Sequence, residues 1–222
     1  GHDFRTSYLN LAKTIRRYLP CAKYLGLTAT ASINVLKDIQ NEFNIPTEHV
    51  KTLTKYSRPE LEFRVIDTPR NKMQKVTQIL RQLDAEKQIL QLREDESACG
   101  LIFTPHVNGD YGCYKVANEL SRTLKTDVRW YSGEVPKIKH NGNSIPLLKN
   151  EDFAIYKNNT QKEFQENRFP ILVATKAFGM GVNKKNIRFT IHYGIPGSME
   201  SLYQEAGRAG RDNQPSQCYV VF

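Results

Sequence analysis

Two arginines stand three positions apart near the end of this 222-residue sequence. They are Arg208 and Arg211, within the run QEAGRAGRD at 204–212, where the glycines remove side chains that would block a ligand. On a helix, residues three apart share one face, so the pair could clamp a polyphosphate. Guanidinium groups also stabilise the charge that builds on a transferring phosphoryl group. The alternative is a surface pair that ends a helix near the negative end of its dipole.

Charge and cysteine content limit which partners and which cellular compartment are plausible. The formal net charge is +9, and a basic surface gains free energy by releasing counterions from nucleic acid, although many basic proteins are merely soluble. The four cysteines are scattered, without a zinc-ligand or disulfide pattern, so we expect no metal site. No apolar run is long enough to cross a bilayer, and the N-terminus lacks a signal-peptide core. We therefore expect no membrane role and an intracellular location, in the cytoplasm or nucleoid, or in the nucleus of a eukaryote.

From residue 57 onward, short β-branched or aromatic runs alternate with helical stretches, which is typical of a parallel sheet covered by helices. The expected strands are 62–67, 100–104, 127–131, 170–175, 188–193 and 217–222. Apolar stripes at helical spacing lie between them, at Met73, Val76, Leu80 and Leu83 and at Cys113, Val116, Ala117, Leu120 and Leu124. A last helix is expected to begin near Ser198. The predicted fold class is α/β.

The first 57 residues form a smaller unit, with helices expected at 7–19 and 32–43 and strands at 22–27 and 50–53. Two strands cannot make a stable parallel sheet by themselves, so this unit reads as the tail of a preceding domain. Arg58 and Pro59 mark the expected boundary, because proline disfavours helix for the residue before it.

One stretch, 134–152, is polar and longer than usual connections between a strand and a helix, so we expect an inserted loop. Its lysines, Lys137, Lys139 and Lys149, could touch a phosphate backbone. A solvated loop face is the favoured interpretation of these charges.

Four motifs occur in an order that resembles the RecQ family of superfamily 2 DNA helicases. QEAGRAGRD at 204–212 resembles motif VI, and VATKAFGMGVNK at 173–184, followed by NIRFTIHYGIP at 186–196, resembles motif V as that family writes it. LTATA at 27–31 resembles motif III, and GHDFR at 1–5 resembles the end of the family's aromatic-rich loop. The resemblance covers essentially the whole chain. It implies a RecA-like second helicase lobe at 58–222, with helices on both faces of a parallel sheet, after a remnant of the first RecA-like lobe at 1–57.

The resemblance assigns roles in ATP hydrolysis to motif VI. It implies that Arg211 is the main arginine finger, that Arg208 supports the γ-phosphate, and that Gln204 positions the helix. In motif V, it implies that Thr175 touches a DNA phosphate and that Gly179 and Gly181 let the backbone approach the nucleotide. A turn that needs unusual φ angles would also explain both glycines.

Asn183 is a departure within motif V, because many helicases of the superfamily have an aspartate near the ribose at that position. The other candidates for nucleic-acid binding lie at the N-terminus, in motif III and after strand 100–104, and they are Phe4, Arg5, Thr28, Thr30, Thr104 and His106. Aromatic stacking on single-stranded DNA is the role implied at the N-terminus, with a frayed terminus as the alternative. Motif III would couple nucleotide state to DNA position, and the pair after the strand could contact phosphates. Trp130 and His192 lie in apolar strands and are better explained as core residues.

The resemblance also implies the activity of the parent protein. A RecQ helicase uses ATP and Mg²⁺ to move along single-stranded DNA and to unwind duplex junctions, with 3′-to-5′ polarity, in repair or recombination. No G-x-x-x-x-G-K-[ST] run occurs in this sequence, so the chain is interpreted as a fragment of the helicase core. We expect the fragment alone to hold neither ATP nor Mg²⁺ and to turn over no ATP.

Two rival interpretations stay open. An RNA helicase of the same superfamily would be stimulated by RNA rather than DNA, and a non-catalytic nucleic-acid-binding module would lack Walker A and DExH residues upstream. The chain is expected to be monomeric, although exposed sheet edges could let it self-associate.

Overall fold

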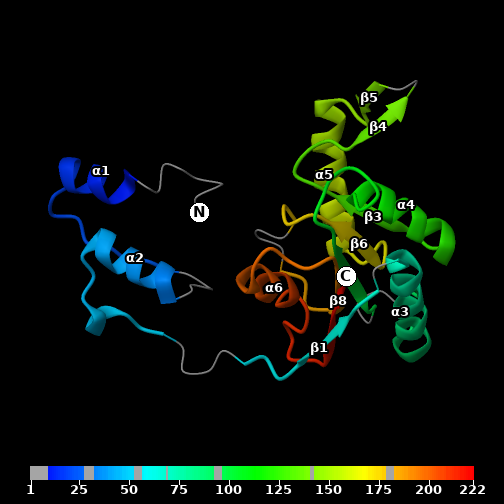
Figure 1. The fold of residues 1–222 in the computed structure, drawn as a ribbon, viewed down its shortest axis with the longest axis horizontal. Helices are drawn as coiled ribbons and strands as arrows, with labels where there is room; N and C mark the ends of the chain where they lie inside the picture. The colour runs from blue at the N-terminus through cyan, green and yellow to red at the C-terminus, as the bar shows by residue number, and fades with distance from the viewer. Residues whose placement is uncertain are drawn as a thin grey trace. The chain divides into compact units, whose positions relative to one another are not determined.

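The computed structural model describes residues 10–27, 33–52, 57–68, 70–92, 97–140, 143–178 and 183–222. The chain divides into two compact units, Gly1–Ser57 and Arg58–Phe222 (Figure 1). Each unit is described by itself.

The first unit is helical where it is described. It contains α1 (Leu11–Tyr18), α2 (Ile33–Phe43) and a short 3-10 helix, η2 (Thr47–His49). The ring of Tyr24 packs edge-on against Phe43 at 5.2 Å. The strands predicted at 22–27 and 50–53 are wrong, because 22–27 and 50–52 are irregular and residue 53 lies outside the described residues. A strand needs a neighbour for its backbone groups, and none is available among the described residues of this unit.

The second unit is built on a six-stranded sheet whose order is β1-β8-β7-β2-β6-β3. Every neighbouring pair in it is parallel. Its strands are β1 (Leu61–Ile66), β2 (Cys99–Phe103), β3 (Val128–Tyr131), β6 (Ile171–Ala174), β7 (Ile187–Tyr193) and β8 (Ser216–Val221). All six strands predicted from residue 57 onward are confirmed to within a residue or two, because buried parallel strands are near-continuous apolar runs.

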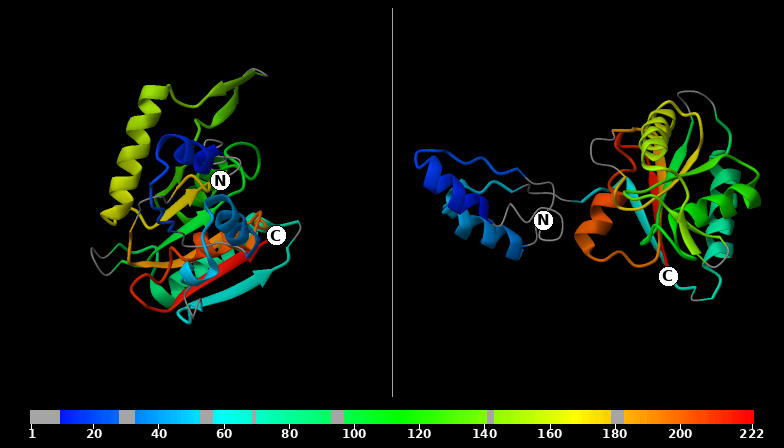
Figure 2. Two further views of the ribbon diagram at one scale, coloured as in Figure 1. Left: turned by 90° about the vertical axis from the view of Figure 1, so that its left-hand side faces the viewer. Right: turned by 90° about the horizontal axis from the view of Figure 1, so that it is seen from above.

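Helices cover both faces of this sheet (Figure 2). On one face, α3 (Lys72–Lys87) and α4 (Cys113–Leu124) bury the predicted apolar stripes in a first core. On the other face, α6 (Met199–Ala206) contributes to a second core. The remaining helix, α5 (Asn150–Gln165), buries Phe153 in the first core and Phe164 in the second. The two cores make the sheet a rigid base for the residues at its edges.

Gly100 shows how closely the first core is packed. A Cβ atom at this position would lie 2.0 Å from the ring of Phe189 on the neighbouring strand β7. No rotamer change removes such an overlap without moving a fully buried ring. The position therefore requires glycine.

The segment expected to be an inserted loop, 134–152, is partly regular. It contains an antiparallel hairpin of β4 (Lys137–His140) and β5 (Asn143–Pro146), and α5 begins at its end. Ile138 pairs with Ile145 across the hairpin, which provides an apolar cross-strand contact that its polar composition concealed.

Candidate functional site

The two arginines of motif VI lie in a turn rather than on a helix. Helix α6 ends at Ala206, and the backbone then turns through bonds from Gly207 N–H to Tyr203 O at 2.9 Å and from Arg208 N–H to Glu205 O at 3.3 Å. Gly210 has φ +64°, a left-handed conformation that other residues rarely adopt. The expectation that both arginines share one helical face is therefore wrong, because the glycines end the helix before them.

Arg58 braces this turn from the start of the second unit. Its Nη2 donates to Ala209 O at 3.2 Å and to Gly210 O at 3.1 Å, and its Nε forms an ion pair with Glu60. Gly210 N–H donates to Ile187 O at 3.1 Å, at the first residue of β7. Arg58 was considered only as a boundary residue, since a contact spanning 151 positions leaves no local pattern in a sequence.

An ion pair fixes the far end of the same turn. Both guanidinium Nη atoms of Arg188, on β7, bond to the two carboxylate oxygens of Asp212, with Nη1 at 3.0 Å from Oδ1. Burial acts to raise the pKa of Asp212, but the bonds from Arg188 and from Gln214 N–H outweigh burial and lower that pKa. The bidentate geometry adds orientation as well as energy.

Arg211 is connected to motif V. Its Nη1 donates to Asn183 Oδ1 at 3.1 Å, and both side chains are exposed. Burial lowers the pKa of the half-buried Arg208, and the nearby charge of Arg211 lowers it further. Two neighbouring guanidinium groups concentrate positive charge, which suits an anionic ligand. Asn183, expected near a ribose, accepts a hydrogen bond from Arg211, while Gln204 is exposed on α6.

A second group of predicted residues gathers at the carboxyl ends of β2 and β6. Thr104 and Thr175 directly follow these strands, joined to the sheet by bonds from Thr104 N–H to Ala174 O at 2.9 Å and from Thr175 N–H to Tyr131 O at 3.1 Å. Both side chains are buried, with exposed fractions of 4% and 7%. His106 is exposed, and its carbonyl accepts a bond from Thr104 Oγ1 at 3.2 Å.

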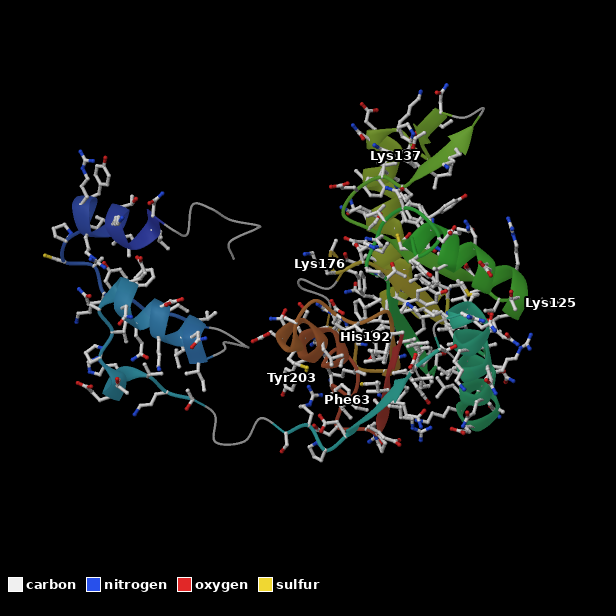
Figure 3. The ribbon with its side chains drawn as sticks, viewed as in Figure 1. Phe63, Lys125, Lys137, Lys176, His192 and Tyr203 are labelled. Carbon is white, nitrogen blue, oxygen red and sulfur yellow. The ribbon has the colours of Figure 1, made fainter. Side chains whose placement is uncertain are left out.

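Lys176, which the motif comparison did not single out, is an exposed cation at this edge (Figure 3). It lines a cavity of about 230 Å³ together with Thr104, Gly194, Ser201 and other residues of this edge. Open α/β sheets bind ligands in the crevice beyond the carboxyl ends of their strands. The position of Lys176 next to Thr175 in motif V was the sequence signal that could have identified it as a candidate ligand-binding residue.

The family described as helicase conserved C-terminal domain matches residues 71–213 of this chain. The chain belongs to that family. The predicted RecQ-type resemblance is confirmed by relatives that carry the name, and the RecA-like second-lobe fold is confirmed as well.

Curated relatives match the whole chain but are much longer. The putative ATP-dependent DNA helicase Q1 of Caenorhabditis elegans is 30% identical over 100% of this chain and 30% of its own length. ATP-dependent DNA helicase RecQ of Bacillus subtilis (strain 168) is 32% identical over 100% of this chain and 32% of its own length. A putative ATP-dependent RNA helicase of Acanthamoeba polyphaga mimivirus is 33% identical over 100% of this chain and 34% of its own length. The chain thus spans about a third of these relatives.

Solved helicase structures share the fold. A Dbp5 variant of S. cerevisiae bound to RNA and ADP BeF3 gives a TM-score of 0.59 at 18% identity, covering 94% of this chain and 47% of that one. Domain 2 of the DEAD-box helicase Mss116p, bound to an RNA duplex, gives 0.54 at 15% identity, covering 73% and 54% of the two chains. At these identities the likeness concerns the fold alone.

Within this helicase domain, His192 links the cavity to motif VI. It is 2% exposed, as expected of a core residue, and its ring stacks on Phe103 at 5.4 Å. Its Nδ1 lies 3.3 Å from Tyr219 O, and its Nε2 lies 3.1 Å from Glu205 Oε2 without hydrogen-bond geometry. Glu205 is part of the QEAGRAGRD run, so one side chain of motif VI borders the carboxyl-edge cavity.

Lys184 anchors the part of motif V that leads from Asn183 to β7. Its buried ammonium donates to Gln165 O at 3.3 Å, bonds to Asn167 Oδ1 and lies 5.2 Å above the ring of Phe164. Burial lowers the pKa of Lys184. These contacts hold the segment beside Arg211 against α5.

Several predicted site residues lie outside the described residues, namely Phe4, Arg5, Thr28, Thr30, Gly179 and Gly181. Within the described ranges, no group of three or more His, Cys, Asp or Glu side chains could hold a metal ion. No helix in the described part of the chain is long and apolar enough to span a membrane.

Proposed function

We propose that this chain is the C-terminal part of the motor core of an ATP-dependent DNA helicase of the RecQ type. The observation that carries the proposal is the turn that holds Arg208 and Arg211 together, with Arg211 bonded to Asn183 of motif V. A phosphate clamp needs guanidinium groups whose positions are set in advance, because reorganisation during the reaction would cost free energy. Relatives named as ATP-dependent DNA helicases Q1 and RecQ support the same activity.

ATP hydrolysis would use the arginine turn. Arg211 would donate to oxygens of the transferring γ-phosphoryl group, where negative charge builds in the transition state. Arg208 would neutralise the same phosphate with its guanidinium, and Gln204 would position α6. Asn183 would orient Arg211 and, with Gly179 and Gly181, would border the nucleotide. The described residues provide no carboxylate cluster for Mg²⁺, so we assign no Mg²⁺ ligand to them.

Single-stranded DNA would run along the carboxyl edge of the sheet. Lys176 and His106 are exposed there and could reach phosphates, with Thr104 and Thr175 supporting the strand ends from beneath. In the first unit, taken as a remnant of the first RecA-like lobe, Phe4, Arg5, Thr28 and Thr30 are proposed to contact nucleic acid as well. The polarity would be 3′-to-5′, and the process repair or recombination, inside the cell.

A matched pair of assays tests this proposal. In the intact protein, single-stranded DNA should stimulate ATP hydrolysis more than RNA does, and Arg211→Ala should lower the stimulated rate by about a thousandfold or more. Arg168→Ala, at an arginine whose side chain is 69% exposed, is the control for loss of a surface guanidinium. The 222-residue chain alone should show no turnover.

Two outcomes would replace the proposal. Stimulation by RNA in preference to DNA would make the protein an RNA helicase. The mimivirus relative carries the name of such an enzyme. Nucleic-acid binding without any hydrolysis in the intact protein would leave a non-catalytic module.

A further inference from the structure

A hairpin that adds little to either core extends from the carboxyl edge of the sheet. The hairpin of β4 and β5 projects away from the sheet (Figure 1). All four residues of β5 are exposed, so burial in a core does not explain the structure of this segment. Its base is nevertheless fixed, because Leu147 N–H donates to Pro136 O at 2.8 Å and Lys137 N–H donates to Asn108 Oδ1 at 2.6 Å. A fixed base with exposed strands presents side chains to a partner.

One face of the hairpin is basic. Side chains alternate between the faces of a strand, so Lys137 and Lys139 share a face with their cross-strand neighbours Pro146 and Ser144. This face lines a groove of about 830 Å³ that is completed by α4 and the loop after β2. Lys137 is labelled at the base of the hairpin in Figure 3.

The charges in the groove favour an anion. The charged lining residues are Asp110, Lys115, Glu119, Arg122, Lys137 and Lys139. Lys115 is paired with Asp110 at 2.5 Å, and this bond lowers the pKa of the Asp110 carboxyl. Arg122, Lys137 and Lys139 are exposed and have no ion pair with a carboxylate of the described residues. Three such cations against Glu119 leave an excess of positive charge.

Among the described residues that line the groove, no exposed ring is available on which a base could stack. Its aromatic lining residue, Tyr114, packs edge-on against Trp130 at 5.8 Å and is partly buried. Proteins that hold single strands combine cations with stacking platforms, whereas a duplex presents its phosphates outward and keeps its bases stacked internally.

We propose that this groove binds the sugar-phosphate backbone of double-stranded DNA, beside the single-stranded track on the same edge. The inference rests on the proposed function. The segment after β2 contributes to both sites, with Thr104 and Pro105 in the cavity that Lys176 also lines and residues 107–110 in the groove, so a duplex there would adjoin DNA held at the cavity. Two-stranded ribbons and basic side chains contact duplexes through charge without reading sequence.

The test compares duplex and single-stranded DNA of equal length by fluorescence anisotropy with the 222-residue chain. Lys137→Gln/Lys139→Gln should weaken duplex binding by about tenfold or more near 0.1 M salt. The slope of log affinity against log salt should fall by about 2, since each lost phosphate contact removes roughly 0.9. Single-strand affinity should change little.

A control variant removes the same amount of positive charge at the C-terminal ends of α3 and α4. Lys87→Gln/Lys125→Gln changes residues at the C-terminal ends of α3 and α4, and it should leave duplex affinity unaltered (Figure 3). An unchanged duplex affinity in the hairpin variant, an equal loss for single strands, or no duplex binding by the wild-type chain would each overturn the inference. ATP hydrolysis by the intact wild-type protein, stimulated by single strands, reports on the proposed function separately.

Discussion

At the amino ends of β7 and β8, the arginine turn is fixed by backbone hydrogen bonds and by side chains outside it, while at the carboxyl ends of β2 and β6 exposed side chains border a cavity. The carbonyls of Ala209 and Gly210 accept from Arg58, and Arg188 pairs with Asp212 beyond them. At the other edge, Lys176 and His106 are exposed and the threonines are covered.

Under the proposed function, the difference follows from what each edge binds. Transition-state stabilisation depends on donors held to within a fraction of an ångström, so the turn needs a brace. A polymer that must slide is better served by flexible cations that accept any sequence. Substitutions at the two edges should therefore separate hydrolysis from nucleic-acid affinity.

After Arg211→Ala itself, the largest effect is expected at the brace. Arg58→Met removes both bonds to the turn carbonyls, so the stimulated kcat should fall by about 10- to 100-fold, with little change in DNA affinity. Arg58→Lys should recover only part of the loss, because the guanidinium serves Glu60 through Nε and both carbonyls through Nη2, whereas an ammonium has a single nitrogen for all three partners.

Arg64→Met is the matched control for the brace, since Arg64 forms a similar pair with Glu62 on the edge strand but contacts no part of the turn. Equal losses of kcat in both variants would contradict a positioning role for Arg58. So would a loss of kcat in Arg58→Met that is explained by a lower free energy of unfolding in urea.

A smaller effect is expected at the ion pair. Asp212→Asn leaves the mostly buried guanidinium of Arg188 without its carboxylate, so the free energy of unfolding should drop by about 2 kcal/mol at pH 7. Because folding lowers the pKa of Asp212, its stabilising contribution is present above the unfolded-state pKa and is lost as pH falls through the folded-state pKa. Urea unfolding should therefore show the gap between wild type and variant closing in acid, below the ordinary aspartate value of 3.8.

The control for this pair is Asp127→Asn, at an aspartate that is 50% exposed and bonded to Arg129. Such a surface pair should contribute well under about 1 kcal/mol. A gap of the same size in both variants, or one that is indifferent to pH, would contradict the assignment.

The smallest effect belongs to the carboxyl edge. Lys176→Gln should weaken single-stranded DNA binding by several-fold and lower its salt slope by about 0.7, the value of one phosphate contact. Titrations at several salt concentrations measure both quantities. Lys185→Gln removes an exposed charge ahead of β7, near the arginine turn, and should leave both unchanged. If Lys185 matters more than Lys176, DNA does not follow the carboxyl edge.

Local sequence pattern was enough to predict most helices and strands of the second unit. Strands such as 171–174 are buried apolar runs, and α4 follows an apolar repeat of three and four, so each can be read within a few residues. The same reasoning failed at 22–27, where an apolar run lacks a pairing partner among the described residues. Local pattern also missed the hairpin of β4 and β5, because its apolar pair, Ile138 and Ile145, lies in a polar segment.

The sequence by itself determined which residues are proposed to carry the chemistry, since QEAGRAGRD and VATKAFGMGVNK are specific by residue type and spacing. Only the tertiary structure decided how they are held. The parallel sheet brings Arg58 to Gly210 across 152 positions, Arg188 to Asp212, and Arg211 to Asn183. Such contacts depend on strand order and on where a helix ends, and neither property leaves a periodic signal in the chain.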